Sequence, residues 1–144
     1  MNYSTQAKIL NIAPPGAAVK SASVTCLSAD RHGFDYATFI IALGTTDTPF
    51  TALKLQESDD NATWTDVPGL DYSIAPAVLP GAADGTHLFT FDVDLRARKR
   101  YLRPLVTLGA GTAGAYVTIL AALHRAEQSP RDSASRGVSG SLLA

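Results

Sequence analysis

The 144-residue sequence has one cysteine, one tryptophan and no apolar run that approaches the roughly 20 residues of a membrane span. A lone cysteine, Cys26, excludes an internal disulfide, and its strand-like surroundings predict a small buried side chain. The N-terminus lacks the charged and apolar regions of a secretion signal, so we expect synthesis in the cytoplasm and no membrane partner.

The sequence also lacks an excess of either charge. Twelve basic and 13 acidic residues give a formal net charge of −1, whereas domains that coat nucleic acid are strongly basic. We therefore predict no nucleic-acid partner. The chain is 46% hydrophobic, which suits one domain that folds without disulfide or metal staples.

Motifs of catalysis and of cofactor binding are missing as well. The glycines of 109–114 have the spacing of a dinucleotide-binding loop, but a strand-like run follows where that motif needs a helix, so we interpret them as a hairpin turn. The three histidines are far apart and have no partner at zinc-ligand spacing, and no Gly-x-Ser-x-Gly elbow is found within the folded part. We predict neither enzyme activity nor a cofactor.

One acidic stretch raises the possibility of a metal. Asp59, Asp60 and Asn61, with Asp66 nearby, could offer oxygen atoms to Ca²⁺. Their spacing does not fit an EF-hand loop, and side chains of these types commonly bond the backbone of tight turns. We therefore expect a hydrogen-bonded turn without a metal.

Alternating apolar and polar residues dominate the sequence. The range 51–69 predicts a β-hairpin, stopped by Pro68-Gly69, with Trp64 as a buried anchor on its return strand. Range 86–94 is the clearest strand and predicts that Phe91 is buried. Further strands are expected at 6–12, 21–28, 34–43, 101–108 and 115–124, with a short one possible at 72–74 and a loop at 29–33.

These strands predict an all-β fold. Pro104 cannot donate to a ladder, which places it at an edge or a bulge. Short strands between Gly/Pro turns, without alternating helices, indicate a two-sheet antiparallel sandwich of residues 1–124. The long connection 69–85 suits strands that cross between sheets, so a jelly roll or Greek key is favoured.

Residues 125–144 differ from the rest. They are rich in serine and glycine and have few apolar anchors before Leu142, so they cannot bury enough surface to order alone. We interpret them as a flexible arm. It is either a simple mobile terminus or a segment that orders against a neighbouring subunit, with Arg131 and Arg136 as polar contacts.

One cluster of basic residues runs from the end of the strand 86–94 into the strand 101–108. Guanidinium groups bind carboxylates bidentately, so Arg96, Arg98, Arg100 and Arg103 are candidates for docking on an acidic protein surface. The alternative is a solvated loop whose charge is balanced by Asp92 and Asp94.

Four stretches of the sequence resemble a known class of proteins. They are Gly33–Phe39, Leu53–Asp60, Thr63–Gly69 and Arg100–Pro104, and they are similar to small structural proteins of tailed bacteriophages that decorate, or cement, the head. The resemblance spans roughly 22–123 and carries no catalytic motif.

This resemblance implies a jelly-roll protein on the outer surface of a virion capsid. It would bridge subunits of the major capsid protein, self-associate as a homodimer or homotrimer, and bind through broad surfaces. Two alternatives stay open: a carbohydrate-binding module, in which Trp64, Tyr72 and Tyr101 stack on sugars, and a tail or connector subunit with the same fold.

Overall fold

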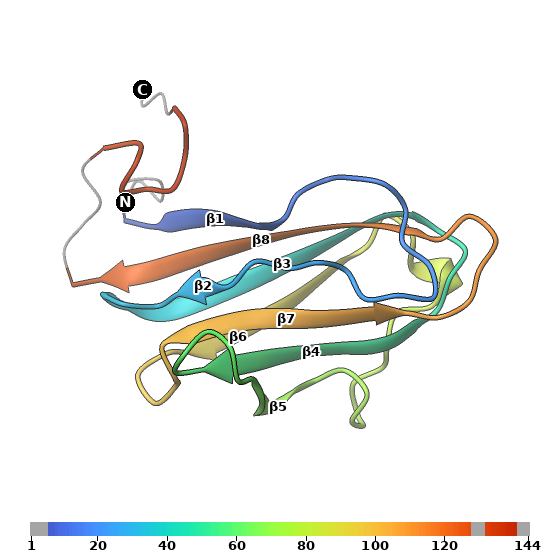
Figure 1. Ribbon diagram of the computed structural model, residues 1–144, viewed down its shortest axis with the longest axis horizontal. Coiled ribbons are helices and arrows are strands. Elements are labelled where there is room, and N and C mark those ends of the chain that lie inside the picture. Colours follow the sequence, from blue (N-terminus) through green and yellow to red (C-terminus); the bar gives the residue numbers. More distant parts are fainter. Residues whose placement is uncertain (1–5, 128–131, 141–144) are drawn as a thin grey trace.

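The computed structural model describes residues 6–127 and 132–140. In this part of the chain, two antiparallel four-stranded sheets pack face to face as a sandwich (Figure 1). The first sheet has the strand order β1-β8-β3-β6, and the second sheet has the order β2-β7-β4-β5. The elements are β1 (Lys8–Ala13), β2 (Ala29–Asp30), β3 (Phe34–Thr46), β4 (Phe50–Ser58), β5 (Thr65–Asp71), the 3₁₀ turn η2 (Ala82–Asp84), β6 (Leu88–Asp94), β7 (Tyr101–Leu108) and β8 (Ala115–Ala126).

The strand order is that of a jelly roll. β1 pairs with β8, β2 with β7, β3 with β6 and β4 with β5, as if one long antiparallel hairpin had been rolled up. Pairing of β8 with β3 and of β7 with β4 then completes the two sheets. Every connection except the β4–β5 hairpin crosses between the sheets. The predicted all-β sandwich is confirmed, and the jelly roll is its form.

The core lies between the inner faces of the two sheets. Because side chains alternate along a strand, Phe39 and Ile41 of β3 are fully buried while Ile40 between them faces outward. Leu53 and Leu55 of β4 supply the opposite face of the core. Phe91 on β6 is 2% exposed, which confirms its predicted burial.

The predicted hairpin exists, with two differences. Thr63 and Trp64 belong to the turn, so the return strand begins at Thr65. The strand also continues through Pro68-Gly69 to Asp71, although these two residues were expected to stop it. β5 lies at the edge of the second sheet and its pairing with β4 is irregular between Lys54 and Gln56, which is where a proline is tolerated.

Three other sequence predictions need correction. Residues 21–28 alternate like a strand but form only an isolated bridge, Ser23 to Thr107. The predicted loop 29–33 instead begins with the short strand β2. Residues 72–74 form a turn. In these segments the available backbone partner rather than the side-chain pattern decides the structure: residues 29–30 pair with β7, whereas 21–28 has only one bridge to it.

Pro104 shows why residues 21–28 pair so little. The Val106 carbonyl accepts a hydrogen bond from the Val24 N–H, and the Leu108 N–H donates to the Ala22 carbonyl. The backbone N–H and C=O groups of the even-numbered residues of β7 therefore point toward residues 21–28. Pro104 shares that direction and has no N–H to offer. β7 is therefore locally an edge at Pro104, as the sequence predicted, even though it lies inside the sheet order.

No helix among the described residues is both long and apolar enough to cross a membrane.

Candidate partner-binding surfaces

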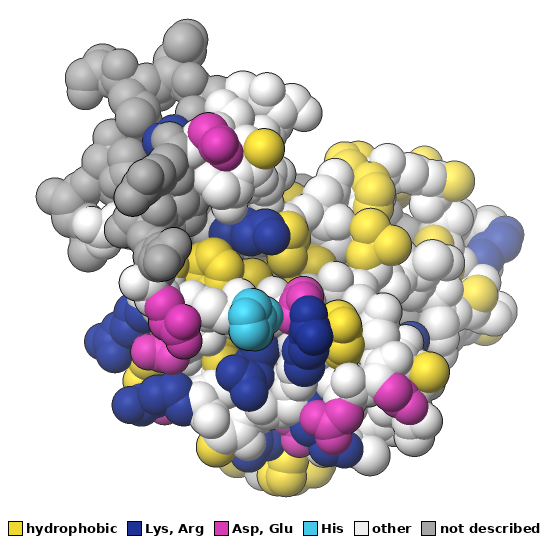
Figure 2. Space-filling view, turned by 60° about the vertical axis from the view of Figure 1, so that its left-hand side comes forward, with side chains coloured by type: hydrophobic (Ala, Val, Ile, Leu, Met, Phe, Trp, Pro, Cys, Tyr) yellow, Lys and Arg dark blue, Asp and Glu magenta, His cyan; other side chains and the backbone are white. Residues whose placement is uncertain are grey.

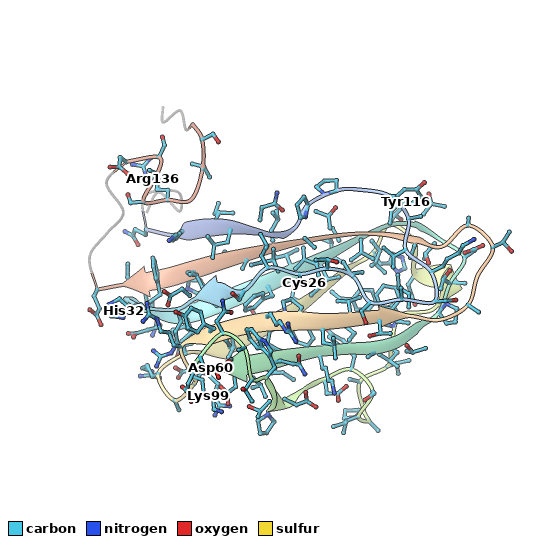
Figure 3. The ribbon with its side chains drawn as sticks, in the orientation of Figure 1. Cys26, His32, Asp60, Lys99, Tyr116 and Arg136 are labelled. Atoms are coloured by element: carbon cyan, nitrogen blue, oxygen red, sulfur yellow. The ribbon has the colours of Figure 1, made fainter. Side chains whose placement is uncertain are left out.

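One end of the sandwich concentrates charged side chains. Loops 31–33, 59–64 and 95–100 meet there beside the C-terminal end of β8 (Figure 1). Figure 2 looks onto this end, where lysine and arginine side chains alternate with aspartate and glutamate around a histidine. His32, Asp60 and Lys99 lie at this charged end, and Tyr116 lies near the opposite end (Figure 3).

Arg96 is bound to a carboxylate of its own chain. Its Nε donates to Asp94 Oδ1 at 2.9 Å and its Nη2 to Asp94 Oδ2, a bidentate pair. Hydrogen bonds from Arg96 hold the pKa of Asp94 below its usual range, and Asp94 in turn raises the pKa of Arg96. The pair is exposed, so water weakens its contribution to stability.

Arg98 and Arg100 also have partners within the chain. Arg98 lies 3.5 Å from Glu57, a largely buried carboxylate that also accepts the Lys99 N–H at 3.0 Å. Arg100 forms a bidentate pair with Asp30, which lies 70 positions away in sequence, and this hydrogen bonding lowers the pKa of Asp30. These contacts provide the charge balance that the sequence left as an alternative, with Asp94, Glu57 and Asp30 as the balancing groups.

Arg103 and Trp64 lie against each other. The Arg103 guanidinium is 4.2 Å from the centroid of the Trp64 ring, and it also donates to Gln56 Oε1 at 3.3 Å. Trp64 is half-buried on the outer side of the second sheet rather than in the core. Trp64 is therefore partly buried, but it is not a core residue and lies in the turn before the return strand: a polar turn holds it at the charged end, where a cation covers the ring.

The described part of the C-terminal arm packs against its own chain. The Arg136 carbonyl accepts the Ile9 N–H of β1 at 2.7 Å. Gly137 has a φ of +76° and lies so close to the Ile9 carbonyl that a Cβ would collide with it. The arm thus contacts the start of β1 around Ile9 (Figure 1), while Arg131 lies outside the described residues.

A second group of cationic and aromatic side chains was missed in the sequence. On the outer face of the first sheet, the Tyr36 ring stacks on His124, with centroids 6.0 Å apart, and it has Arg96 at 5.7 Å and Arg125 at 4.5 Å. Tyr36 pairs with His124 across β3 and β8. The residues come from two strands and a loop that are far apart in the sequence, so no sequence spacing could reveal the group.

The same outer face is apolar toward its other end. Leu88, Tyr116 and Leu120 are exposed, and Ile40 and Ala42 lie between them on β3. The register aligns Ala42 with Leu88 on one side and Ile40 with Leu120 on the other. The outer face of the first sheet is therefore apolar at one end and charged at the other.

The outer side of the second sheet has a shallow groove of about 300 Å³ between residues 23–26 and β7. Cys26 lines it together with Arg103, Pro104 and Leu105. The Cys26 side chain is half-buried, and burial raises the pKa of its thiol to about 11. The thiol stays protonated and unreactive near neutral pH, in keeping with the structural role predicted for it.

The aromatic residues considered for sugar binding are spread over separate places. Tyr72 packs edge-on against Phe89 and Phe91, and its hydroxyl donates to the Thr90 carbonyl at 2.9 Å in the gap between β5 and β6. Trp64 and Tyr101 lie at the charged end, each against an arginine. The three rings do not form one platform.

The acidic and glycine-rich loops are held by internal hydrogen bonds. Asp60 accepts from the backbone of Thr63 and Ala62 and from the Ser58 hydroxyl, the turn that the sequence predicted, and these bonds lower its pKa. Asp47 binds three successive N–H groups, of residues 112–114. No group of three potential metal ligands gathers within residues 6–127 and 132–140.

No protein-family model matches the sequence, and no curated protein matches it. Among solved structures, the fold is similar to that of the SPBc2 prophage-derived protein YomS, with a TM-score of 0.53 and 14% identity over 81% of this chain and 91% of that one. It is also similar to the PBSX exported protein XepA, with a TM-score of 0.56 and 22% identity over 100% of this chain and 44% of that one. At these identities the two likenesses establish a shared fold.

Proposed function

We propose that this chain is a structural protein of a tailed-bacteriophage particle, which binds the outside of the capsid and bridges subunits of the major capsid protein. The observation that carries the proposal is the fold: two proteins of prophage origin share it, one over 91% of its length. The stretches that resemble phage head decoration proteins lie within this jelly roll.

The fold suits such a role physically. A protein that binds only the assembled shell stabilises that shell by mass action, and many copies add up. A rigid sandwich offers two broad outer faces, and the arm at 132–140, bound to the start of β1 through Arg136 and Ile9, adds a third contact region. The arginines at 96, 98, 100 and 103 stay candidates for docking, although their in-chain partners would have to be exchanged or shared.

A tail or connector subunit is the second candidate. XepA is described as an exported protein, and this chain spans 44% of its length, so the same fold also serves as one part of a larger protein. A carbohydrate-binding module is less well supported, because the three aromatic rings proposed for stacking lie apart and each is already packed against neighbouring side chains.

The test is to mix the purified chain with phage heads that lack it and, separately, with isolated tails and with host polysaccharide, and to measure what sediments. We expect saturable binding to heads and greater resistance of those heads to heat. Binding to tails alone would replace the capsid role by the tail role. Binding to polysaccharide alone would favour the carbohydrate alternative, and binding to none of the three would contradict all of them.

A further inference from the structure

The outer face of the first sheet contains a cation without a carboxylate partner. Odd-numbered residues of β8 up to Leu123 point into the core, so Arg125 would point inward in a regular strand. Its φ of +55° breaks this alternation, and the guanidinium instead lies 4.5 Å from the Tyr36 ring centroid on the outer face. Among the described residues Arg125 has no ion pair.

The same face contains a carboxylate without a cation. Asp92 on β6 points outward and accepts a hydrogen bond from Thr38 Oγ1 at 2.7 Å, but no lysine or arginine of the described residues pairs with it. Its neighbour on the same face, Asp94, is paired with Arg96. One cation and one anion therefore remain unpaired within two rows of the sheet.

Exposed apolar side chains continue the face beyond these charges. Leu88 is 66% exposed, Tyr116 50% and Leu120 39%, while Ala42 beside Leu88 in the register is small. A contiguous exposed apolar area next to polar groups is typical of a protein–protein interface. The outer face of the first sheet thus combines the large apolar side chain of Leu88 and the small one of Ala42 beside it with the cation of Arg125 and the anion of Asp92, neither of which has an ion pair among the described residues.

We infer that this face packs on the same face of a second copy of the chain, with Arg125 of each copy bound to Asp92 of the other. A twofold axis parallel to the strands and along β3 places β8 of one copy over β6 of the other, because β6 is the edge strand of this sheet. Ile40 and Ala42 then face the same residues of the other copy, Leu120 faces the row of Thr90 beside Leu88, and the end of β8 faces the rows of Asp92 and Asp94. Self-complementarity of this kind is what an isologous dimer requires. Stacking on Tyr36 holds the Arg125 guanidinium in place, so less rotamer entropy is lost on pairing.

The test is a charge exchange measured by sedimentation velocity. The wild-type chain should be a dimer, Arg125→Glu and Asp92→Arg should each weaken dimerisation by about tenfold or more, and the double variant should recover most of that loss. The matched control is Lys54→Glu, which reverses a charge on the outer side of the second sheet and should leave dimerisation unchanged. Circular dichroism verifies folding of each variant.

Raising salt from about 50 to about 500 mM provides a measurement on the unmodified chain, and it should weaken the dimer. A wild-type chain that is monomeric up to about 1 mM, or a double variant no better than the single ones, would overturn the inference. The experiment uses the free chain alone. A monomer that still binds phage heads would contradict this interface and leave the proposed function standing. A dimer that binds no phage particle would support this interface and contradict the proposed function.

Discussion

The loop between β6 and β7 and the outer face of the first sheet both carry arginines, but the arginines are in different situations. In the loop, Arg98 reaches Glu57 and Arg100 reaches Asp30, so the basic charge is already neutralised within the chain. On the sheet face, Arg125 stacks on Tyr36 with no carboxylate beside it among the described residues. A run of basic residues in a sequence therefore does not by itself show which charges remain available to a partner, because pairing with distant residues decides that.

Glu57→Gln tests most strongly whether the loop arginines are structural. The Glu57 carboxylate is largely buried, pairs with Arg98 and accepts the Lys99 N–H, so its loss should lower the free energy of unfolding by about 2–3 kcal/mol. Urea denaturation measures this change. Asp59→Asn is the matched control, because Asp59 is exposed and lies 3.8 Å from Lys99 Nζ, and it should change little. Equal effects of the two variants would mean that the pair with Arg98 does not support the loop.

Trp64→Ala should have a smaller effect. Trp64 is half-buried and gains its main polar contact from Arg103, so we expect a loss of about 1–2 kcal/mol in the free energy of unfolding. Urea denaturation of Trp64→Ala distinguishes this loss from the larger loss that truncation of a core side chain would cause. A loss above about 3 kcal/mol would restore the sequence-based view of Trp64 as the anchor of the hairpin.

Acidification should produce the smallest change in stability. Hydrogen bonds lower the pKa values of Asp94, Asp60 and Asp47 in the folded chain. The stabilisation from their ionised forms is present above the ordinary value of about 4 and is lost as the pH falls through and below it. Thermal unfolding should thus show an unchanged Tm between about pH 7 and 5 and a modest decrease below about pH 4. A Tm that rises on acidification would contradict the role of these turns.

Local patterns were enough to predict the all-β two-sheet sandwich, and the strand pairing then decided for a jelly roll over a Greek key. Period-2 alternation predicted the inward side chains of β6, and the crossing of the long connection between the sheets followed from its length. The pattern misled at residues 21–28, because an alternating segment becomes a strand only where a neighbour offers backbone groups, and Pro104 withholds one.

The candidate sites were harder to predict, for a related reason. Arg100 pairs with a residue 70 positions earlier, and Arg103 covers a tryptophan from another loop. The outward turn of Arg125 depends on one backbone angle at the end of β8, which no residue preference of arginine indicates. Contacts between segments far apart in sequence therefore decided which arginines pair with a carboxylate.

The most direct test of this account compares Arg98→Ser with Arg125→Ser in two measurements, the Tm at low protein concentration and the Kd of self-association. The account predicts that Arg98→Ser lowers the Tm and leaves the Kd unchanged, because Arg98 supports Glu57 inside the chain. It predicts that Arg125→Ser raises the Kd by about tenfold and leaves the Tm unchanged. The opposite pattern, or the same pattern for both variants, would contradict the claim that the unpaired arginine of the sheet face is the one that binds a partner.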